Sequence, residues 1–251
     1  MADLSIGCAV VFGATGGLGQ AVARRMAVLG SNLVITYRKQ PESLHPLIGE
    51  LKSAGVKVSV TECDVTRLQS VREAFAAAQR EYGIIHSVLN TVGLPYKESP
   101  LAELDEGLFR AVLEVDVIGF LNIAKAVIPI MRRQGAGSLV TVGTTAQERV
   151  HEGNSLSSIP KSTVAMMVRH LAAEEGKHGI RVNMVGAGVY NAGMALHDAT
   201  VDDLDRQYSD TIALRRIGQA AEFAGAAAFM TTDAASYITG QVLQSDGGLS
   251  L

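Results

Sequence analysis

A cluster of glycines directly after the first apolar run constrains this chain more than any other feature. Gly13, Gly17 and Gly19 follow the run Cys8–Phe12 and open a stretch of helical period, Gly19–Leu29. Without Cβ atoms the backbone can turn tightly there, and the N-terminus of a helix attracts phosphate. This G-x-x-x-G-x-G turn between a strand and a helix predicts a pyrophosphate site, although similar turns also occur for packing reasons.

Short apolar or β-branched runs alternate with longer stretches of helical period along the chain. The predicted strands are Cys8–Phe12, Leu33–Tyr37, Val56–Val60, Ile84–Asn90, Ser138–Val142, Ile180–Val185 and Gln241–Ser245. The clearest helical periods are Gly19–Leu29, Val71–Tyr82 and Phe109–Arg133. This βαβ rhythm predicts an α/β fold: a single-domain, Rossmann-type, doubly wound parallel sheet over residues 1–251, with helices on both faces. Ligands are then expected at the carboxyl ends of the strands.

Composition narrows the classes of partner. With 251 residues, 47% of them hydrophobic, the chain can bury a core without metals or disulfides. A net charge of −3 provides no basic surface for nucleic acid, and no apolar run reaches the roughly 18 residues of a membrane span. Cys8 and Cys63 lie in separate apolar runs, which favours reduced thiols, and no spacing suggests a metal site. We expect a cytoplasmic protein that acts on a small molecule.

One segment interrupts the βαβ rhythm. Residues 189–214 form a long insertion before the helical stretch around Ala220–Met230. Because long insertions in compact domains often cover substrates, and this one leaves the sheet at the expected site, we interpret it as a substrate lid. The alternative is a solvated surface excursion.

The residues after the second predicted strand indicate which dinucleotide is bound. A carboxylate usually takes the ribose hydroxyls at this position, whereas this chain has Tyr37, Arg38 and Lys39. A guanidinium can pair with a 2′-phosphate and stack on adenine, which favours NADP(H) over NAD(H). A solvated basic turn is the alternative interpretation.

Over nearly the whole chain these features resemble the short-chain dehydrogenase/reductase family, whose T-G-x-x-x-G-x-G loop corresponds here to Phe12-Gly13-x-x-x-Gly17-x-Gly19. Later motifs follow the family's order: Asp64–Val65, Asn90–Thr91–Val92–Gly93, Ile180–Arg181–Val182–Asn183, Gly188, Arg216–Ile217–Gly218, Ile238–Thr239–Gly240 and Asp246–Gly247–Gly248. The motifs and this resemblance together imply that the following residues bind the cofactor: Gly13, Thr15, Gly16, Gly17, Leu18, Gly19, Tyr37, Arg38, Lys39, Asp64, Val65, Asn90, Val92, Gly93, Lys161, Gly188 and Val189.

The catalytic positions depart from the family pattern of Asn, Ser, Tyr and Lys. The corresponding residues here are Asp116, Thr144, Ser157 and Lys161, so only the lysine is unchanged. The family threonine that commonly holds the nicotinamide carboxamide is Ala192. A serine hydroxyl is far less acidic than a phenol and ends several Å short of it, so reduction of a ketone is expected to suffer.

Reduction of a conjugated C=C bond is the chemistry that this altered set favours. Hydride added to the β-carbon produces an enolate, which the Lys161 ammonium can stabilise. Asp116, placed near Lys161 through a water chain, would reprotonate the water that delivers a proton to carbon. Thr144 is a candidate donor to the substrate oxygen. The Asp-plus-Lys pattern without tyrosine resembles the 2,4-dienoyl-CoA reductase branch, particularly its peroxisomal type.

Several alternatives stay open for these residues. Ser157 precedes Pro160 in a pattern typical of a helix N-cap, Thr144 suits a strand-end turn, and nearby groups can satisfy Asp116. His151 is a possible substitute proton donor. The alternative functions are a carbonyl reductase or alcohol dehydrogenase, a catalytically silent dinucleotide-binding pseudoenzyme, and a redox-neutral isomerase or dehydratase.

Self-association is a further expectation. Resemblance to the family implies a homo-oligomer, a dimer or tetramer, assembled through the long helices predicted at Phe109–Arg133 and Ser158–Gly176. Burial of the same apolar faces against the sheet within one subunit is the alternative.

Overall fold

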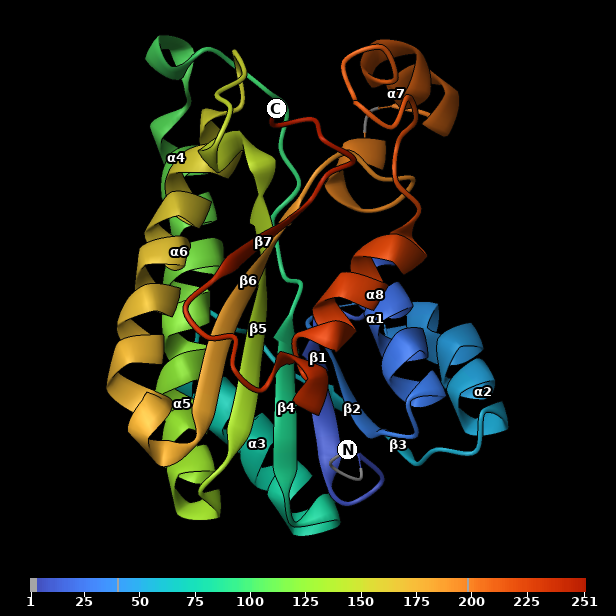
Figure 1. Cartoon of the computed structure of the whole chain (residues 1–251), viewed down its shortest axis with the longest axis vertical. Helices are drawn as coiled ribbons and strands as arrows, with labels where there is room; N and C mark the ends of the chain where they lie inside the picture. Colours follow the sequence, from blue (N-terminus) through green and yellow to red (C-terminus); the bar gives the residue numbers. More distant parts are fainter. Residues whose placement is uncertain (1–3, 40, 198) are drawn as a thin grey trace.

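A parallel sheet forms the centre of the molecule, as Figure 1 shows for the computed structural model, which describes residues 4–39, 41–197 and 199–251. Over these residues seven strands pair in the order β3-β2-β1-β4-β5-β6-β7, each parallel to its neighbours. The strands are β1 (Cys8–Phe12), β2 (Asn32–Tyr37), β3 (Val58–Glu62), β4 (Ile85–Asn90), β5 (Gly137–Thr144), β6 (Ile180–Ala187) and β7 (Val242–Ser245). The predicted doubly wound fold is confirmed.

Helices cover both faces of the sheet and bury two separate hydrophobic clusters (Figure 1). One face carries α1 (Gly17–Val28), α2 (His45–Ser53) and α8 (Ala220–Phe229); the other carries α3 (Leu68–Tyr82), α4 (Glu106–Leu113), α5 (Gly119–Gln134) and α6 (Ser155–Glu175). Short 3-10 turns occur at Pro41–Leu44, Leu101–Glu103, Thr145–Gln147, Gly176–His178, Gly193–Leu196 and Asp233–Ala235. Because both faces are covered, the central strand β1 is apolar and fully buried, whereas the edge strand β3 is partly exposed and contains polar residues.

The predicted helix over Phe109–Arg133 is divided in the structure. It consists of α4, a π-helical turn over Glu114–Ile118 and α5. At the end of the turn the backbone packs closely on the loop after β3, since a Cβ on Gly119 would lie 2.8 Å from Val65 Cγ2. Single π turns inside helices are often found at functional sites, and this one contains Asp116.

Several predicted boundaries are wrong by two or three residues, among them the start of α3 at Leu68 and the end of β5 at Thr144. The third strand covers Val58–Glu62 instead of Val56–Val60. The helix α6 begins at Ser155 with Asn154 as its N-cap residue, so Ser157 lies inside the first turn and is not the helix cap. Pro160 is accommodated within α6 and does not mark its start.

The carboxyl ends of the strands form the edge at which functional groups gather. The strands that follow β1 in the sequence lie first on one side of it, as β2 and β3, and then on its other side, beginning with β4. The topological switch point therefore lies between β1 and β4. The segment after β6, which contains α7 (Val201–Tyr208), lies beyond this edge (Figure 1). Over the described residues, no helix combines the length and apolarity needed to cross a membrane.

Candidate active site

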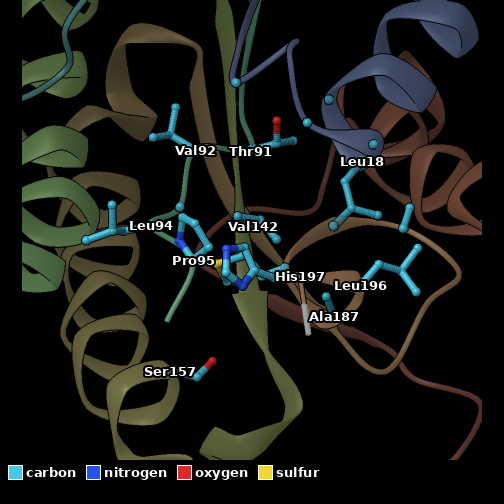
Figure 2. A pocket seen from close by; sticks show the side chains of 18 of the residues that line it. Leu18, Thr91, Val92, Leu94, Pro95, Val142, Ser157, Ala187, Leu196 and His197 are labelled. Carbon is cyan, nitrogen blue, oxygen red and sulfur yellow. The ribbon is translucent and has the colours of Figure 1, made fainter. Parts of the chain in front are cut away.

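A cavity of about 980 Å³ opens at the carboxyl edge of the sheet. The loops after β1, β2, β4, β5 and β6 contribute to its walls, together with the first turns of α6. Figure 2 shows Leu18 of α1 on one side and Ser157 of α6 on the other, with Thr91, Val92, Leu94 and Pro95 on the loop after β4. We call this the active-site cavity.

The glycine loop is shaped by close backbone contacts. Gly13 has a φ of +82°, which L side chains rarely adopt, and a Cβ on Gly19 would lie 2.2 Å from the Gly13 carbonyl oxygen. Thr91 holds the loop from the neighbouring strand end, because its hydroxyl donates to the Phe12 carbonyl at 2.7 Å. These contacts bring the first turn of α1 to the cavity wall.

The N-terminus of α1 fits an anionic ligand. Among the described residues no side chain caps this helix, and its first turn contains no acidic residue. Its first N–H groups therefore lie at the cavity with the positive end of the helix dipole, an arrangement that suits a pyrophosphate. Arg38 and Lys39, both exposed, line the same cavity after β2.

Most of the residues predicted to bind the cofactor line the active-site cavity. They are Gly13, Thr15, Gly16, Gly17, Leu18, Gly19, Tyr37, Arg38, Lys39, Val65, Val92, Gly93, Lys161, Gly188 and Val189. Asp64 and Asn90 do not line the cavity; their side chains form hydrogen bonds with nearby protein groups. The Asp64 carboxylate accepts hydrogen bonds from Thr66, and the buried Asn90 amide donates to Thr141 Oγ1 at 3.1 Å.

The side chains of Lys161 and Asp116 form a buried ion pair. Lys161 Nζ donates to Asp116 Oδ2 at 2.6 Å, and the two side chains are 5% and 4% exposed. The expected water chain between them is therefore replaced by direct contact, since the π turn brings Asp116 against α6. Lys161 lines the cavity, whereas Asp116 lies behind it. Within the described part of the chain, Asp116 Oδ1 has no hydrogen-bond partner.

Ser157 lines the active-site cavity together with a tyrosine. Its side chain is buried, and Tyr96, on the loop after β4, lines the same cavity close enough for the Ser157 hydroxyl to act on the pKa of the phenol. Burial raises the pKa of Tyr96 to about 12; the charges of Asp116 and Glu98 add to this increase, and the Ser157 hydroxyl opposes it. The phenol is therefore protonated at neutral pH.

The loop that carries Tyr96 is held against the start of α6. Asn154 Nδ2 donates to Glu98 Oε1 at 2.9 Å, and the Ser99 backbone N–H donates to the Gly153 carbonyl at 3.2 Å. These bonds are two short bridges between segments more than 50 positions apart. They hold the loop that carries Tyr96 close to the first turn of α6, which contains Ser157.

Thr144 lies at the end of β5 and lines the cavity. It is 9% exposed, and its Oγ1 accepts from the Ala146 backbone N–H at 3.2 Å, so the hydroxyl also stabilises the turn there. His151 does not line the cavity, and its Nε2 is buried without a hydrogen-bond partner among the described residues. Over the same residues, no group of three or more His, Cys, Asp or Glu side chains is arranged to hold a metal.

Comparison with known proteins identifies the family. The family described as enoyl-(acyl carrier protein) reductase matches residues 13–250. A short-chain type dehydrogenase/reductase from Mycobacterium marinum superimposes with a TM-score of 0.91 at 26% identity, over 98% of this chain and 96% of that one. The chain belongs to the short-chain dehydrogenase/reductase family.

Two curated members show the range of related enzymes. A 3-oxoacyl-(acyl-carrier-protein) reductase from Staphylococcus epidermidis is 27% identical over 96% of this chain and 98% of its own length. A 7alpha-hydroxysteroid dehydrogenase from Bacteroides fragilis is 28% identical over 96% of this chain and 93% of its own. This short-chain dehydrogenase/reductase is thus an oxidoreductase by family.

Sequence reasoning missed Leu94 and Tyr96, which line the site of this short-chain dehydrogenase/reductase. Met194, His197 and Tyr208 also line it, and they belong to the segment 189–214 that the sequence suggested as a substrate lid. Tyr96 was overlooked because the comparison with the family motif stopped at Gly93, although the loop after a parallel strand is where ligands bind. Its position at the carboxyl edge of β4 was the available signal.

Proposed function

We propose that the protein is an NADP(H)-dependent reductase of a conjugated C=C bond in an enoyl, dienoyl or enone substrate. The buried ion pair of Lys161 and Asp116, on a cavity wall where α6 carries serine in place of tyrosine, is the observation that carries this proposal. A reduced nicotinamide, when bound, supplies the hydride.

The protein's own residues have distinct tasks in this scheme. The first turn of α1 binds the pyrophosphate, and the basic side chains after β2 bind the 2′-phosphate. Lys161 Nζ has further N–H donors beyond the one directed at Asp116, which suit a ribose hydroxyl or a substrate oxygen. Thr144 donates its hydroxyl hydrogen to the substrate carbonyl, since its oxygen already accepts from Ala146.

The direct ion pair alters the expected electrostatics. Because the Asp116 carboxylate contacts Lys161, the pair is neutral as a unit and stabilises an enolate less than an isolated ammonium would. Neutral hydrogen-bond donors on the cavity wall must then contribute more to stabilising charge on the substrate oxygen. A conjugated thioester or enone forms an enolate whose negative charge is delocalised. This substrate class therefore depends least on a full positive charge at Lys161.

The substrate class is tested by turnover. The purified protein is incubated with NADPH and a panel of enoyl- and dienoyl-thioesters, enones, 3-oxoacyl thioesters and hydroxysteroid ketones, with absorbance at 340 nm as the readout. Substrate-dependent oxidation of NADPH with the conjugated compounds, at rates above those with isolated ketones, is expected. Equal or faster turnover of ketones would favour carbonyl reduction instead.

Carbonyl reduction is the second candidate, and the curated relatives support it, since both are named for reactions at a carbonyl or hydroxyl carbon. Stabilisation of the fold by NADPH without turnover of any compound would indicate a pseudoenzyme. Product formation without net loss of NADPH would indicate an isomerase or dehydratase.

The cofactor preference is tested at Arg38. We expect the Arg38→Ala variant to bind NADPH more weakly by on the order of 10- to 100-fold, because a charged hydrogen bond to the 2′-phosphate is lost. Affinity for NADH is expected to change little. Fluorescence titration measures both, with Arg80→Ala on the exposed face of α3 as the control. An equal loss for the two cofactors would contradict a 2′-phosphate contact.

A further inference from the structure

We propose that Tyr96 is the proton donor of this active site and supplies, from the loop after β4, the phenol that α6 lacks at Ser157. This inference rests on the proposed reductase function and adds a residue to it. Tyr96 and Ser157 both line the active-site cavity with Lys161 and Thr144, and two hydrogen bonds anchor the loop that carries Tyr96 to the start of α6.

The position of Tyr96 is determined by contacts on both sides of it. The loop is anchored to the start of α6 by the bond from Asn154 to Glu98 and by the bond from Ser99 to Gly153. Ser157 lies one helical turn before Lys161 on α6, so the two side chains share one face of the helix. The anchored loop thus holds the Tyr96 phenol on the cavity wall near the start of α6, the helix that carries Ser157 and Lys161.

The charge state of the neighbours suits a donor. Asp116 and Glu98 are the carboxylates whose charges act on Tyr96, and both keep its pKa high. The Lys161 ammonium is paired with Asp116 and is not among the groups that lower the pKa of Tyr96. Tyr96 therefore acts in its protonated form and gives up its proton only as negative charge develops on a substrate oxygen.

The proposed reduction adds one hydride and one proton to the substrate. Hydride, which a reduced nicotinamide dinucleotide supplies with its two electrons, joins the β-carbon of the substrate. The π pair of the C=C bond then moves to form an enolate, and the enolate oxygen takes the Tyr96 hydroxyl proton. The Ser157 hydroxyl donates to the resulting phenolate, and a proton from solvent restores Tyr96. The enol rearranges to the saturated carbonyl compound, for a total consumption of one hydride and one proton.

A second tyrosine–serine pair provides a matched control. Tyr82 at the end of α3 hydrogen-bonds Ser59 Oγ at 2.8 Å, and burial raises the pKa of Tyr82 to about 12, as it does for Tyr96. Neither Tyr82 nor Ser59 lines the active-site cavity. Tyr82→Phe therefore removes a similar phenol from a similar partner without touching the site.

The kinetic test compares Tyr96→Phe with Tyr82→Phe on the best substrate of the panel. We expect kcat of Tyr96→Phe to fall roughly 100- to 10,000-fold, the usual contribution of a general acid. KM and the dinucleotide Kd are expected to stay within about 2-fold, because binding groups are intact. Tyr82→Phe should retain wild-type kcat.

A readout without turnover tests the contact itself. With tyrosine labelled by ¹³C at Cζ, the Tyr96 resonance is identified by its loss in Tyr96→Phe. Ser157→Ala should shift this resonance and leave that of Tyr82 in place. An unchanged Tyr96 resonance would show that the hydroxyls do not meet and would overturn the proposal.

The outcomes separate the donor role from the proposed function. Wild-type kcat in Tyr96→Phe, or a raised KM with unchanged kcat, overturns the assignment of Tyr96 and leaves the reductase function in place. Absence of turnover by the wild-type protein on every conjugated substrate overturns the proposed function, and with it the donor role. A low kcat confined to Tyr96→Phe, together with the resonance shift, supports both.

Discussion

At the residue scale, Asp116 and Lys161 depend on each other. Both side chains are almost fully buried, and the pair is joined at 2.6 Å across two elements that are 45 positions apart. Taking either charge out of water is costly unless its partner is present. The aspartate therefore provides a close counter-charge for buried Lys161, the only one of the four predicted catalytic positions that matches the family pattern.

Removal of one partner is expected to destabilise the fold more than removal of both. Lys161→Met leaves the Asp116 carboxylate buried without its cation, which typically costs about 3–5 kcal/mol. The double variant Lys161→Met/Asp116→Leu is expected to recover much of this loss. Urea unfolding of the four proteins gives the coupling free energy. Additive losses would mean that the two charges act independently.

At the element scale, the strand–turn–helix unit of β1 and α1 shows why glycine is required at particular places. A Cβ on Gly19 would collide with the Gly13 carbonyl oxygen, whereas a Cβ on Gly49 in α2 would have no other atom within 4 Å. The two glycines therefore have opposite roles: one permits a close backbone approach, and the other only weakens an exposed helix.

Alanine at these two positions should change stability in opposite directions. Gly19→Ala is expected to lower the free energy of unfolding by about 1–3 kcal/mol, because the loop must shift to admit the methyl group, and to weaken dinucleotide binding. Gly49→Ala is expected to raise it by roughly 0.5–1 kcal/mol, since alanine favours the helix. Thermal unfolding with and without NADPH measures both. A neutral Gly19→Ala would show that the loop is not tightly packed.

At the scale of the whole molecule, the partly buried side chain of His86 makes stability depend on pH. His86 on β4 lies between the hydroxyls of Ser31 and Ser87, and burial lowers its pKa from 6.5 to about 4. Between these two values the unfolded chain binds a proton that the folded protein does not. The contribution of His86 to the free energy of unfolding is therefore fully present above about pH 6.5, and this contribution is lost as the pH falls toward 4.

The size of this loss is on the order of 3 kcal/mol, from the difference between the two pKa values. We expect His86→Gln to remove most of the decline in unfolding free energy between pH 6.5 and pH 4. Denaturant unfolding at several pH values measures the slope, and His45→Gln at an exposed site on α2 should retain it. A wild-type slope in His86→Gln would assign the pH dependence to other groups.

Features that depend on neighbouring residues could be predicted from the amino-acid sequence. Apolar runs specified the strands and their burial on both faces, and the spacing of Gly13, Gly17 and Gly19 marked the turn before α1. Asp116, Thr144 and Lys161 were also found from the sequence, because they correspond to positions of the family pattern. Such features are local, so no knowledge of distant contacts was needed.

Which of these groups lie in contact depends on the packing of distant segments and could not be predicted from the sequence. The π turn brings Asp116 into direct contact with Lys161, and the path of the loop after β4 places Tyr96 at Ser157. The helical period of the sequence did not indicate the π turn. Because α6 begins at Ser155, the interpretation of Ser157 as the helix cap was wrong by about one turn. Contacts between distant segments depend on how helices and loops pack on the sheet, because a shift of one residue redirects every side chain that follows.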